Sequence, residues 1–124
     1  MKVLLSIKPE YAEKILEGTK QFEFRKAIPR AEGIKTVVIY ATMPVGKVIG
    51  EFDIDGFLAE KPSKLWSITS EFSGISKKYF YEYFRGRETA YAFKVQKVRR
   101  YEQPLELNAV LNRAKPPQSF CYLL

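Results

Sequence analysis

The sequence predicts an α+β fold in which about five to six short strands form a small mixed β-barrel, flanked by two or three short helices. Apolar and polar residues alternate, or β-branched residues cluster, in several short segments that are typical of strands. Helical periodicity is confined to brief stretches between these segments. Short, widely separated strands with an early crossover helix favour a small barrel over a doubly wound parallel sheet.

The first part of the chain predicts a strand, a helix and a second strand. Lys2–Ile7 is apolar enough to be buried on both faces. Pro9 suits the first position of a helix, where its missing N–H costs nothing, and Gly18 suits the residue just past the end. Phe22–Arg25 then alternates apolar and charged residues, which is the period of a strand.

Two further strands follow. Thr36–Ala41 is the strongest β-branched run of the chain and indicates a central strand. Val48–Phe57 alternates again. Gly50 and Gly56 inside this pattern indicate a bulge or bend of the kind that closes a small barrel.

Two helices are expected in the middle of the chain. One begins at Pro62 and carries Trp66, which we interpret as a core anchor, not as a platform for a stacked base. The other begins after the N-cap Ser76 and ends near Gly86. Its core face is expected to carry Tyr79, Phe80, Tyr83 and Phe84. The opposite face, which carries Lys77, Tyr81 and Arg85, is either a nucleic-acid contact or an ordinary solvated surface.

The last two strands close the fold. Thr89–Val98 alternates and predicts a fifth strand, which runs into a basic edge made by Lys97, Arg99 and Arg100. The final apolar segment, Ser119–Leu124, is expected to be a closing strand. Because no repeat or linker interrupts the pattern, we interpret residues 1–124 as one domain.

Composition narrows the possible chemistry. The 124 residues include nine Phe, eight Tyr and one Trp, enough large side chains for a core without disulfides. The single cysteine, Cys121, excludes an internal disulfide and a cysteine-based metal site. Because the sequence has no histidine, imidazole catalysis and His-ligated metals are excluded as well. We therefore expect neither a metal nor another cofactor.

The N-terminus carries only a short apolar run. Val3-Leu4-Leu5 lies between Lys2 and Ser6, which is too short for the core of a signal peptide or for a membrane span. We therefore expect a cytoplasmic protein that does not contact a membrane.

The net charge of +7 comes entirely from the second half of the sequence. Residues 1–60 hold nine Lys or Arg and nine Asp or Glu, whereas residues 61–124 hold twelve and five. Such a surplus favours a polyanion, in particular a nucleic acid, as the partner.

A polar triplet marks the candidate site. On a strand over residues 22–25, Glu23 and Arg25 point away from the phenylalanines and lie about 6 to 7 Å apart. Lys20 lies just upstream, at the exit of the helix. A carboxylate beside a guanidinium either locks the strand as an ion pair or offers donors and an acceptor to a nucleobase, a ribose or a phosphate.

These residues belong to a longer pattern. Leu5-Ser6-Ile7, a short helix and then Gly18-x-Lys20-x-x-Glu23-x-Arg25 resemble the signature of the ASCH domain, the homology domain of activating signal cointegrator, within the PUA-like superfamily. Later segments that resemble the small standalone prokaryotic members are Tyr40-Ala41-Thr42-x-Pro44, Val48-Ile49-Gly50-Glu51-Phe52, Ser73-Gly74-Ile75 and Pro117-Gln118-Ser119-Phe120. The resemblance covers essentially the whole chain.

The resemblance implies a PUA-like β-barrel with flanking helices and a cleft lined by the signature residues, with RNA binding as the usual inferred role. We therefore expect Lys20, Glu23 and Arg25 in the cleft. Secondary candidates for ligand binding are Lys8, Thr42, Gln118 and Ser119. The expected partner is RNA or another nucleic acid, or a nucleoside-like small molecule, in RNA processing or in the regulation of transcription or translation.

An enzyme is the competing interpretation. Some small ASCH members resemble amidohydrolases that act on acetylated cytidine through a Lys, a Thr and a Glu, and ribonuclease activity has been proposed for others. Here the Lys matches Lys20, the Thr position holds Glu23, and the Glu could only be Glu71. Glu23 has no hydroxyl to serve as a nucleophile, so the sequence departs from the amidohydrolase pattern.

A ribonuclease would need only a general base and a cation to stabilise the phosphorane. Glu23 could be the base, and Lys20 or Arg25 the stabilising cation. We rank binding without catalysis first, hydrolysis second and a protein-interaction module third.

Overall fold

The structure is a computed structural model that describes residues 1–30, 33–111, 115–118 and 120–123. The strands are β1 (Lys2–Ile7), β2 (Phe22–Arg25), β3 (Thr36–Ala41), β4 (Lys47–Glu60), β5 (Ala90–Leu105) and β6 (Phe120–Leu123). The helices in the described part are α1 (Pro9–Glu17), α2 (Pro62–Thr69), α3 (Lys77–Tyr83) and α4 (Leu107–Val110), with a 3-10 turn η1 (Ser70–Phe72).

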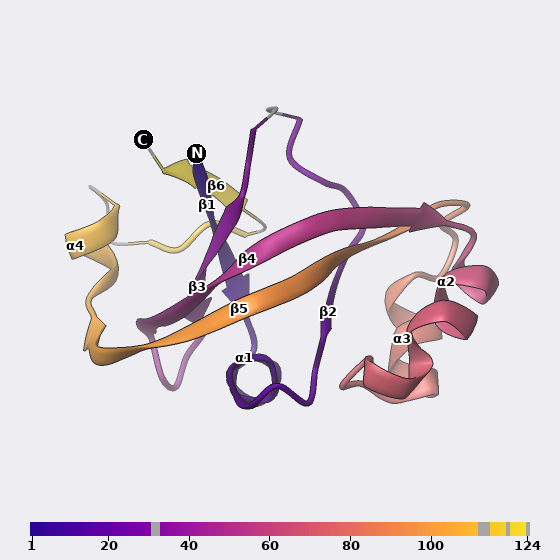
Figure 1. Cartoon of the computed structure of the whole chain (residues 1–124), viewed down its shortest axis with the longest axis horizontal. Coiled ribbons are helices and arrows are strands. Elements are labelled where there is room, and N and C mark those ends of the chain that lie inside the picture. The colour runs from indigo at the N-terminus through magenta and orange to yellow at the C-terminus, as the bar shows by residue number, and fades with distance from the viewer. Residues whose placement is uncertain (31–32, 112–114, 119, 124) are drawn as a thin grey trace.

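All six strands form one mixed sheet in the order β2-β5-β4-β3-β1-β6 (Figure 1). β1 and β3 run parallel, because the chain passes through α1 and β2 between them. The other neighbouring strands are antiparallel. The predicted α+β class, with strands dominating, is confirmed.

Helix α1 forms as its end signals predict. Pro9 occupies the first helical position, and Gly18 adopts a left-handed conformation with φ of 90°, which a residue with a side chain adopts only at a cost. The helix buries Ala12 and Ile15 against the sheet. After Gly18 the chain leaves the helix and enters β2 at Phe22.

Strands β4 and β5 are longer than the sequence pattern predicts. β4 ends at Glu60 instead of Phe57, and β5 continues to Leu105 instead of Val98. The two strands pair along their length, from Val48 opposite Leu105 to Glu60 opposite Ala90, so each supplies the other's backbone hydrogen bonds even where local alternation fades. The pairing shifts register at three places, and two of them include a glycine of β4, Gly50 or Gly56, as the sequence predicts.

Helix α4 was not predicted. It is a single turn, too short to show helical periodicity in the sequence. Leu107 and Leu111 pack there with Leu4 and Val38, and cover one face of the sheet. In Figure 1, α4 lies at one end of the long β4–β5 ribbon, while α2 and α3 lie together at the other.

Two apolar clusters frame the region between α1 and α3. The first packs α1 against β1, β3 and β4, and includes Ile15 and Phe52. The second packs α2 and α3 against β2 and β5 around Phe24 and Phe80. Trp66 is half-buried with its ring centroid 5.0 Å from that of Phe80, so it belongs to this core as expected.

No helix in the described part of the chain is long and apolar enough to cross a membrane.

Candidate ligand-binding pocket

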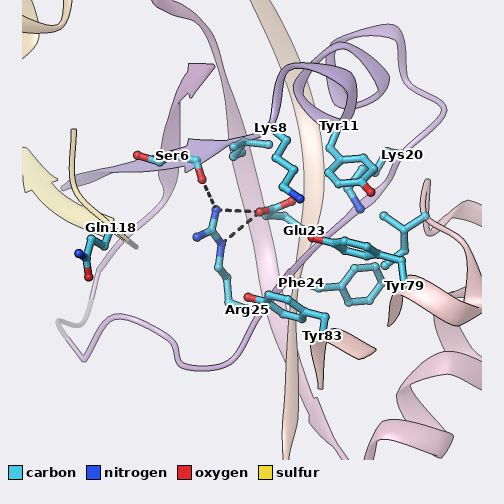
Figure 2. A pocket seen from close by; sticks show the side chains of 12 residues that line it. Ser6, Lys8, Tyr11, Lys20, Glu23, Phe24, Arg25, Tyr79, Tyr83 and Gln118 are labelled. Carbon is cyan, nitrogen blue, oxygen red and sulfur yellow. Dashed lines mark hydrogen bonds and ion pairs between the residues drawn. The ribbon is translucent and has the colours of Figure 1, made fainter. Parts of the chain in front are cut away.

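A pocket of about 260 Å³ lies between α1, β2 and α3. Its lining comprises Ser6, Ile7, Lys8, Tyr11, Lys20, Glu23, Phe24, Arg25, Ile75, Tyr79, Tyr83 and Gln118. Figure 2 shows Lys8 and Tyr11 reaching in from α1, Tyr79 and Tyr83 from α3, and the charged pair Glu23 and Arg25 between them.

Glu23 and Arg25 form a buried ion pair. Arg25 Nε donates to Glu23 Oε2 at 3.1 Å, and Arg25 Nη2 lies 2.9 Å from the same oxygen. Nη2 also donates to the backbone oxygen of Ser6 at 2.9 Å. Alternation along β2 places Phe24 in the core and both charges on the other side. The guanidinium therefore links β2 to β1, two strands that are not neighbours in the sheet.

Lys20 is the most deeply buried charged residue of the pocket, with 2 % of its surface exposed. Its Nζ donates to the backbone oxygen of Ser73 at 2.6 Å and lies 4.7 Å from the centroid of the Phe24 ring. Burial lowers the pKa of the Lys20 ammonium from 10.5 to about 8; the charge of Glu23 raises it, and the charges of Lys14 and Arg25 lower it. The Lys20 side chain is therefore mostly charged at neutral pH, and it can lose its proton at mildly alkaline pH.

The turn at Ser73 and Gly74 holds Lys20 in place. Lys14 Nζ donates to the oxygen of Gly74 at 3.1 Å, next to the oxygen that accepts from Lys20. Gly74 has φ of 69°, and a Cβ placed on it would lie 2.6 Å from Cβ and Cγ of Lys20. The backbone can pack this closely against the lysine stem only because residue 74 is a glycine.

Tyr11, Tyr79 and Tyr83 form a tyrosine wall in the pocket, and Lys20 Nζ lies 5.6 Å from the centroid of the Tyr11 ring. The rings of Tyr79 and Tyr83 are stacked, with centroids 6.3 Å apart and planes 12° apart. Tyr11 lies 5.5 Å from Tyr79 in a tilted arrangement. All three are half-buried, so part of each ring faces the pocket.

The prediction for helix α3 therefore needs correction. Phe80 and Phe84 are buried in the core as expected, but Tyr79 and Tyr83 lie at the edge of that face and line the pocket. Helical spacing groups all four residues together, and only the two hydroxyl groups distinguish those that border a polar space.

The structure brings together most of the residues that the sequence singled out. Lys8, Lys20, Glu23, Arg25 and Gln118 all line the pocket, and Figure 2 shows Gln118 on the far side of Ser6 from the tyrosines.

The other three candidates lie elsewhere. Thr42 is not in the lining: its backbone N–H donates to Ile7 and its carbonyl accepts from Val45 in the turn after β3. Glu71 is exposed on η1, also outside the lining. Ser119 lies outside the described residues.

The residues predicted to form a basic edge, Lys97, Arg99 and Arg100, lie within β5, and both arginines are paired with acids. Arg99 Nη2 pairs with Glu51 and with Asp53 at 2.8 Å, and Arg100 Nη2 pairs with Glu13 at 2.6 Å. Acidic residues of the first half of the chain thus offset part of the basic surplus of the second. Lys77 and Tyr81 on α3 and Arg85 just after it are exposed, which fits either of the two interpretations of that face. Among the described residues, no group of three or more acidic or cysteine side chains is placed to hold a metal ion.

These features define the class of protein. It is an α+β protein with one mixed sheet and a pocket lined by buried charges and tyrosines. The sequence matches the ASCH domain family over residues 5–116, and the chain belongs to this family. The ASCH domain-containing ribonuclease of Zymomonas mobilis is 32% identical over 126 residues, which cover 97% of this chain and 82% of that protein.

Solved structures show the same fold. The crystal structure of ASCH from Zymomonas mobilis matches with a TM-score of 0.91 at 31% identity, and the match covers 99% of this chain and 87% of that one. The N-terminal domain of Staphylothermus marinus McrB has the fold at 15% identity, with a TM-score of 0.53 over 90% of this chain and 79% of that one.

Two relatives from Ureaplasma parvum are much longer than this chain. ATP synthase subunit alpha is 34% identical and a large ribosomal subunit protein is 32% identical, each over 122 residues and 98% of this chain. The chain spans only 15% of the length of the first and 39% of the second.

Proposed function

We propose that this protein binds RNA and that one nucleobase enters the pocket between α1, β2 and α3. The observation that carries the proposal is that Lys20, Glu23 and Arg25 line the same pocket as the three tyrosine rings. Aromatic rings stack on unpaired bases, and buried charges can hydrogen-bond to the base edges. RNA is favoured over other polymers because the Zymomonas mobilis relative is named a ribonuclease.

The charged groups offer both kinds of hydrogen bond that a base edge needs. The Lys20 ammonium and the Arg25 guanidinium are donors, and the Glu23 carboxylate is an acceptor. The volume of about 260 Å³ lies just below the usual range for ligand pockets, about 300 to 1,000 Å³, which suits one base better than a larger group. The net charge of +7 would attract the polyanion to the surface.

Helix α3 offers a matched pair of variants for the test. Tyr79 lines the pocket, whereas Tyr81 is 38% exposed and is not in the lining. The binding of a labelled single-stranded RNA is followed by fluorescence anisotropy for the wild type, Tyr79→Leu and Tyr81→Leu. Loss of one stacked base costs about 1 to 3 kcal/mol, so Tyr79→Leu should weaken binding by about 5-fold to 150-fold.

Tyr81→Leu is expected to bind like the wild type. The opposite result, in which Tyr81→Leu weakens binding and Tyr79→Leu does not, would place the RNA on the outer face of α3 and contradict the proposal.

Hydrolysis of RNA in the same pocket is the second candidate. It is favoured by the name of the Zymomonas mobilis relative and by Lys20, whose pKa of about 8 permits proton transfer near neutral pH. The test incubates a labelled RNA with the wild type, Lys20→Met and Glu23→Gln. Cleavage that both variants lose would support a hydrolase, and binding without cleavage by the wild type would leave the protein as a binding module.

Acetylated cytidine is less well supported as a substrate. The amidohydrolase pattern includes a Thr hydroxyl, and among the described residues of the lining Ser6 is the only one besides the tyrosines that carries a hydroxyl. The Ser6 hydroxyl donates to the backbone oxygen of Pro117 at 2.7 Å. No carboxylate or lysine hydrogen-bonds to it among the described residues.

A further inference from the structure

Two lysines lie over the tyrosines of helix α3. Lys8 Nζ is 5.1 Å from the centroid of the Tyr79 ring, and Lys26 Nζ is 4.9 Å from that of Tyr83. Lys8 comes from the start of α1 and Lys26 from the residue after β2, so different elements deliver the two ammonium groups. Because Tyr79 and Tyr83 are one helical turn apart, the lysines mark two separate points along the tyrosine wall.

Neither lysine has a carboxylate partner within the part of the chain that the structure describes. Three other lysines do: Lys2 pairs with Glu51, Lys47 with Glu106 and Lys64 with Glu60. The carboxylate inside the pocket, Glu23, is held by Arg25.

The ring contacts of the two lysines are weak enough to be exchanged. Lys8 and Lys26 are exposed, and a cation over an aromatic ring at an exposed site contributes only about 0.5 to 1 kcal/mol. A phosphate oxygen forms a charge-assisted hydrogen bond with an ammonium, which is roughly twice as strong as a neutral one. Both lysines can therefore turn from the rings to an anion beside the pocket.

We propose that Lys8 and Lys26 bind the two phosphates on either side of the nucleotide whose base occupies the pocket. The ligand is then a nucleotide within a strand, not a free nucleoside. This inference rests on the proposed function, because it takes the base to be seated against the tyrosines. A nucleoside would reach the tyrosines and the buried charges but would leave both ammonium groups unmatched.

The salt dependence of binding tests the role of each lysine. Affinity for a labelled single-stranded RNA is measured at several salt concentrations for the wild type, Lys8→Ala, Lys26→Ala and the control Lys61→Ala. Lys61 is an exposed lysine that precedes α2 and does not line the pocket. Each phosphate contact contributes about 0.7 to the slope of log K against log salt for single strands.

Lys8→Ala and Lys26→Ala should each lower that slope by about 0.7, whereas Lys61→Ala should leave it as in the wild type. Lys8→Arg and Lys26→Arg should keep the slope, because they keep the charge. If the alanine variants have the slope of the Lys61→Ala control, the two lysines do not bind phosphates and the inference is overturned.

Competition with small ligands tests the form of the nucleotide. A mixture of the four nucleoside 3′,5′-bisphosphates should displace the labelled RNA at a concentration at least tenfold lower than the four nucleosides. The doubly substituted Lys8→Ala/Lys26→Ala protein should lose this advantage. Equal potency of bisphosphates and nucleosides in the wild type would overturn the inference.

These outcomes separate the two levels of the proposal. If the wild type does not bind RNA, or if Tyr79→Leu does not weaken binding, the proposed function itself fails. If RNA binding depends on Tyr79 but not on either lysine, only the phosphate contacts are wrong.

Discussion

Arg25 on β2 donates to Glu23, two residues earlier on the same strand, and also to the backbone oxygen of Ser6 on β1. The pair is buried: 6% of Glu23 and 9% of Arg25 is exposed. It joins the edge strand β2 to β1, although three other strands lie between them in the sheet. The charges that we propose to recognise a base therefore also hold the wall of the pocket in place.

Removal of Glu23 should destabilise the protein strongly. Glu23→Ala leaves the Arg25 guanidinium buried without its counter-charge, which typically costs about 3 to 5 kcal/mol. Glu13 offers a matched control, because its pair with Arg100 has both side chains nearly half exposed, at 46% and 48%. Glu13→Ala should cost less than about 1 kcal/mol. Urea unfolding of both variants measures the two losses, and equal losses would contradict the structural role of the buried pair.

Gly74 should tolerate a methyl group less well than Gly86. Both adopt positive φ, 69° and 77°, so an alanine strains the backbone at either position by about 1 to 2 kcal/mol. A Cβ at Gly86 meets nothing within 4 Å, whereas at Gly74 it would overlap the stem of Lys20. Gly74→Ala should therefore lower the free energy of unfolding by clearly more than Gly86→Ala, and should weaken RNA binding as well. Thermal unfolding and anisotropy of the two variants test this, and similar effects at both positions would disprove the close packing on Lys20.

The buried lysine should make stability depend on alkaline pH. The pKa of Lys20 is about 8 in the folded protein and 10.5 when the chain is unfolded, so between these values the unfolded state binds more protons. Stability from this group therefore rises as pH increases from about 8 to 10.5, by up to about 3 kcal/mol. Lys20→Met lacks this contribution, and the difference between wild type and variant cancels the other titrating groups. Between pH 7 and pH 10, urea unfolding should show the stability of the wild type rising relative to that of Lys20→Met, and a constant difference would contradict the lowered pKa.

The same titration should affect binding in the opposite direction. The Lys20 ammonium is charged below about pH 8 and loses its proton above this value. Any electrostatic attraction between Lys20 and bound RNA therefore weakens as the pH rises through this value. Lys20→Arg keeps the charge up to much higher pH. Anisotropy titrations from pH 7 to 9.5 should show a loss of affinity for the wild type that the arginine variant lacks. Parallel pH profiles would show that the charge of Lys20 does not reach the ligand.

Local patterns in the sequence predict most of the elements. Strands over Lys2–Ile7, Phe22–Arg25 and Thr36–Ala41 have the bounds that alternation and β-branched runs indicate. The ends of β5 and the whole of α4 were not predicted. β5 is extended by its partner strand and α4 is stabilised by the leucines it buries, and neither cause is visible in a local window.

The pocket could be predicted from the sequence only in part. The signature spacing groups Lys20, Glu23 and Arg25, but the oxygen that holds Lys20 belongs to Ser73, 53 residues away. Because it is a backbone atom, the type of residue at position 73 does not predict this contact. Tyr79 and Tyr83 were assigned to the core because helical spacing cannot separate a core face from the pocket edge beside it. The sequence does not predict that Arg99 and Arg100 are paired with acids, because those acids are distant in sequence.

The most direct test of the account is to observe which residues respond to RNA. Backbone amide resonances of ¹⁵N-labelled protein are followed by NMR while a short single-stranded RNA is added. The account predicts that the largest shifts cluster at residues lining the pocket, among them Tyr11, Lys20, Arg25 and Tyr79, with little change at Tyr81 on the outer face of α3. Shifts that cluster on that outer face, with the pocket unchanged, would contradict it.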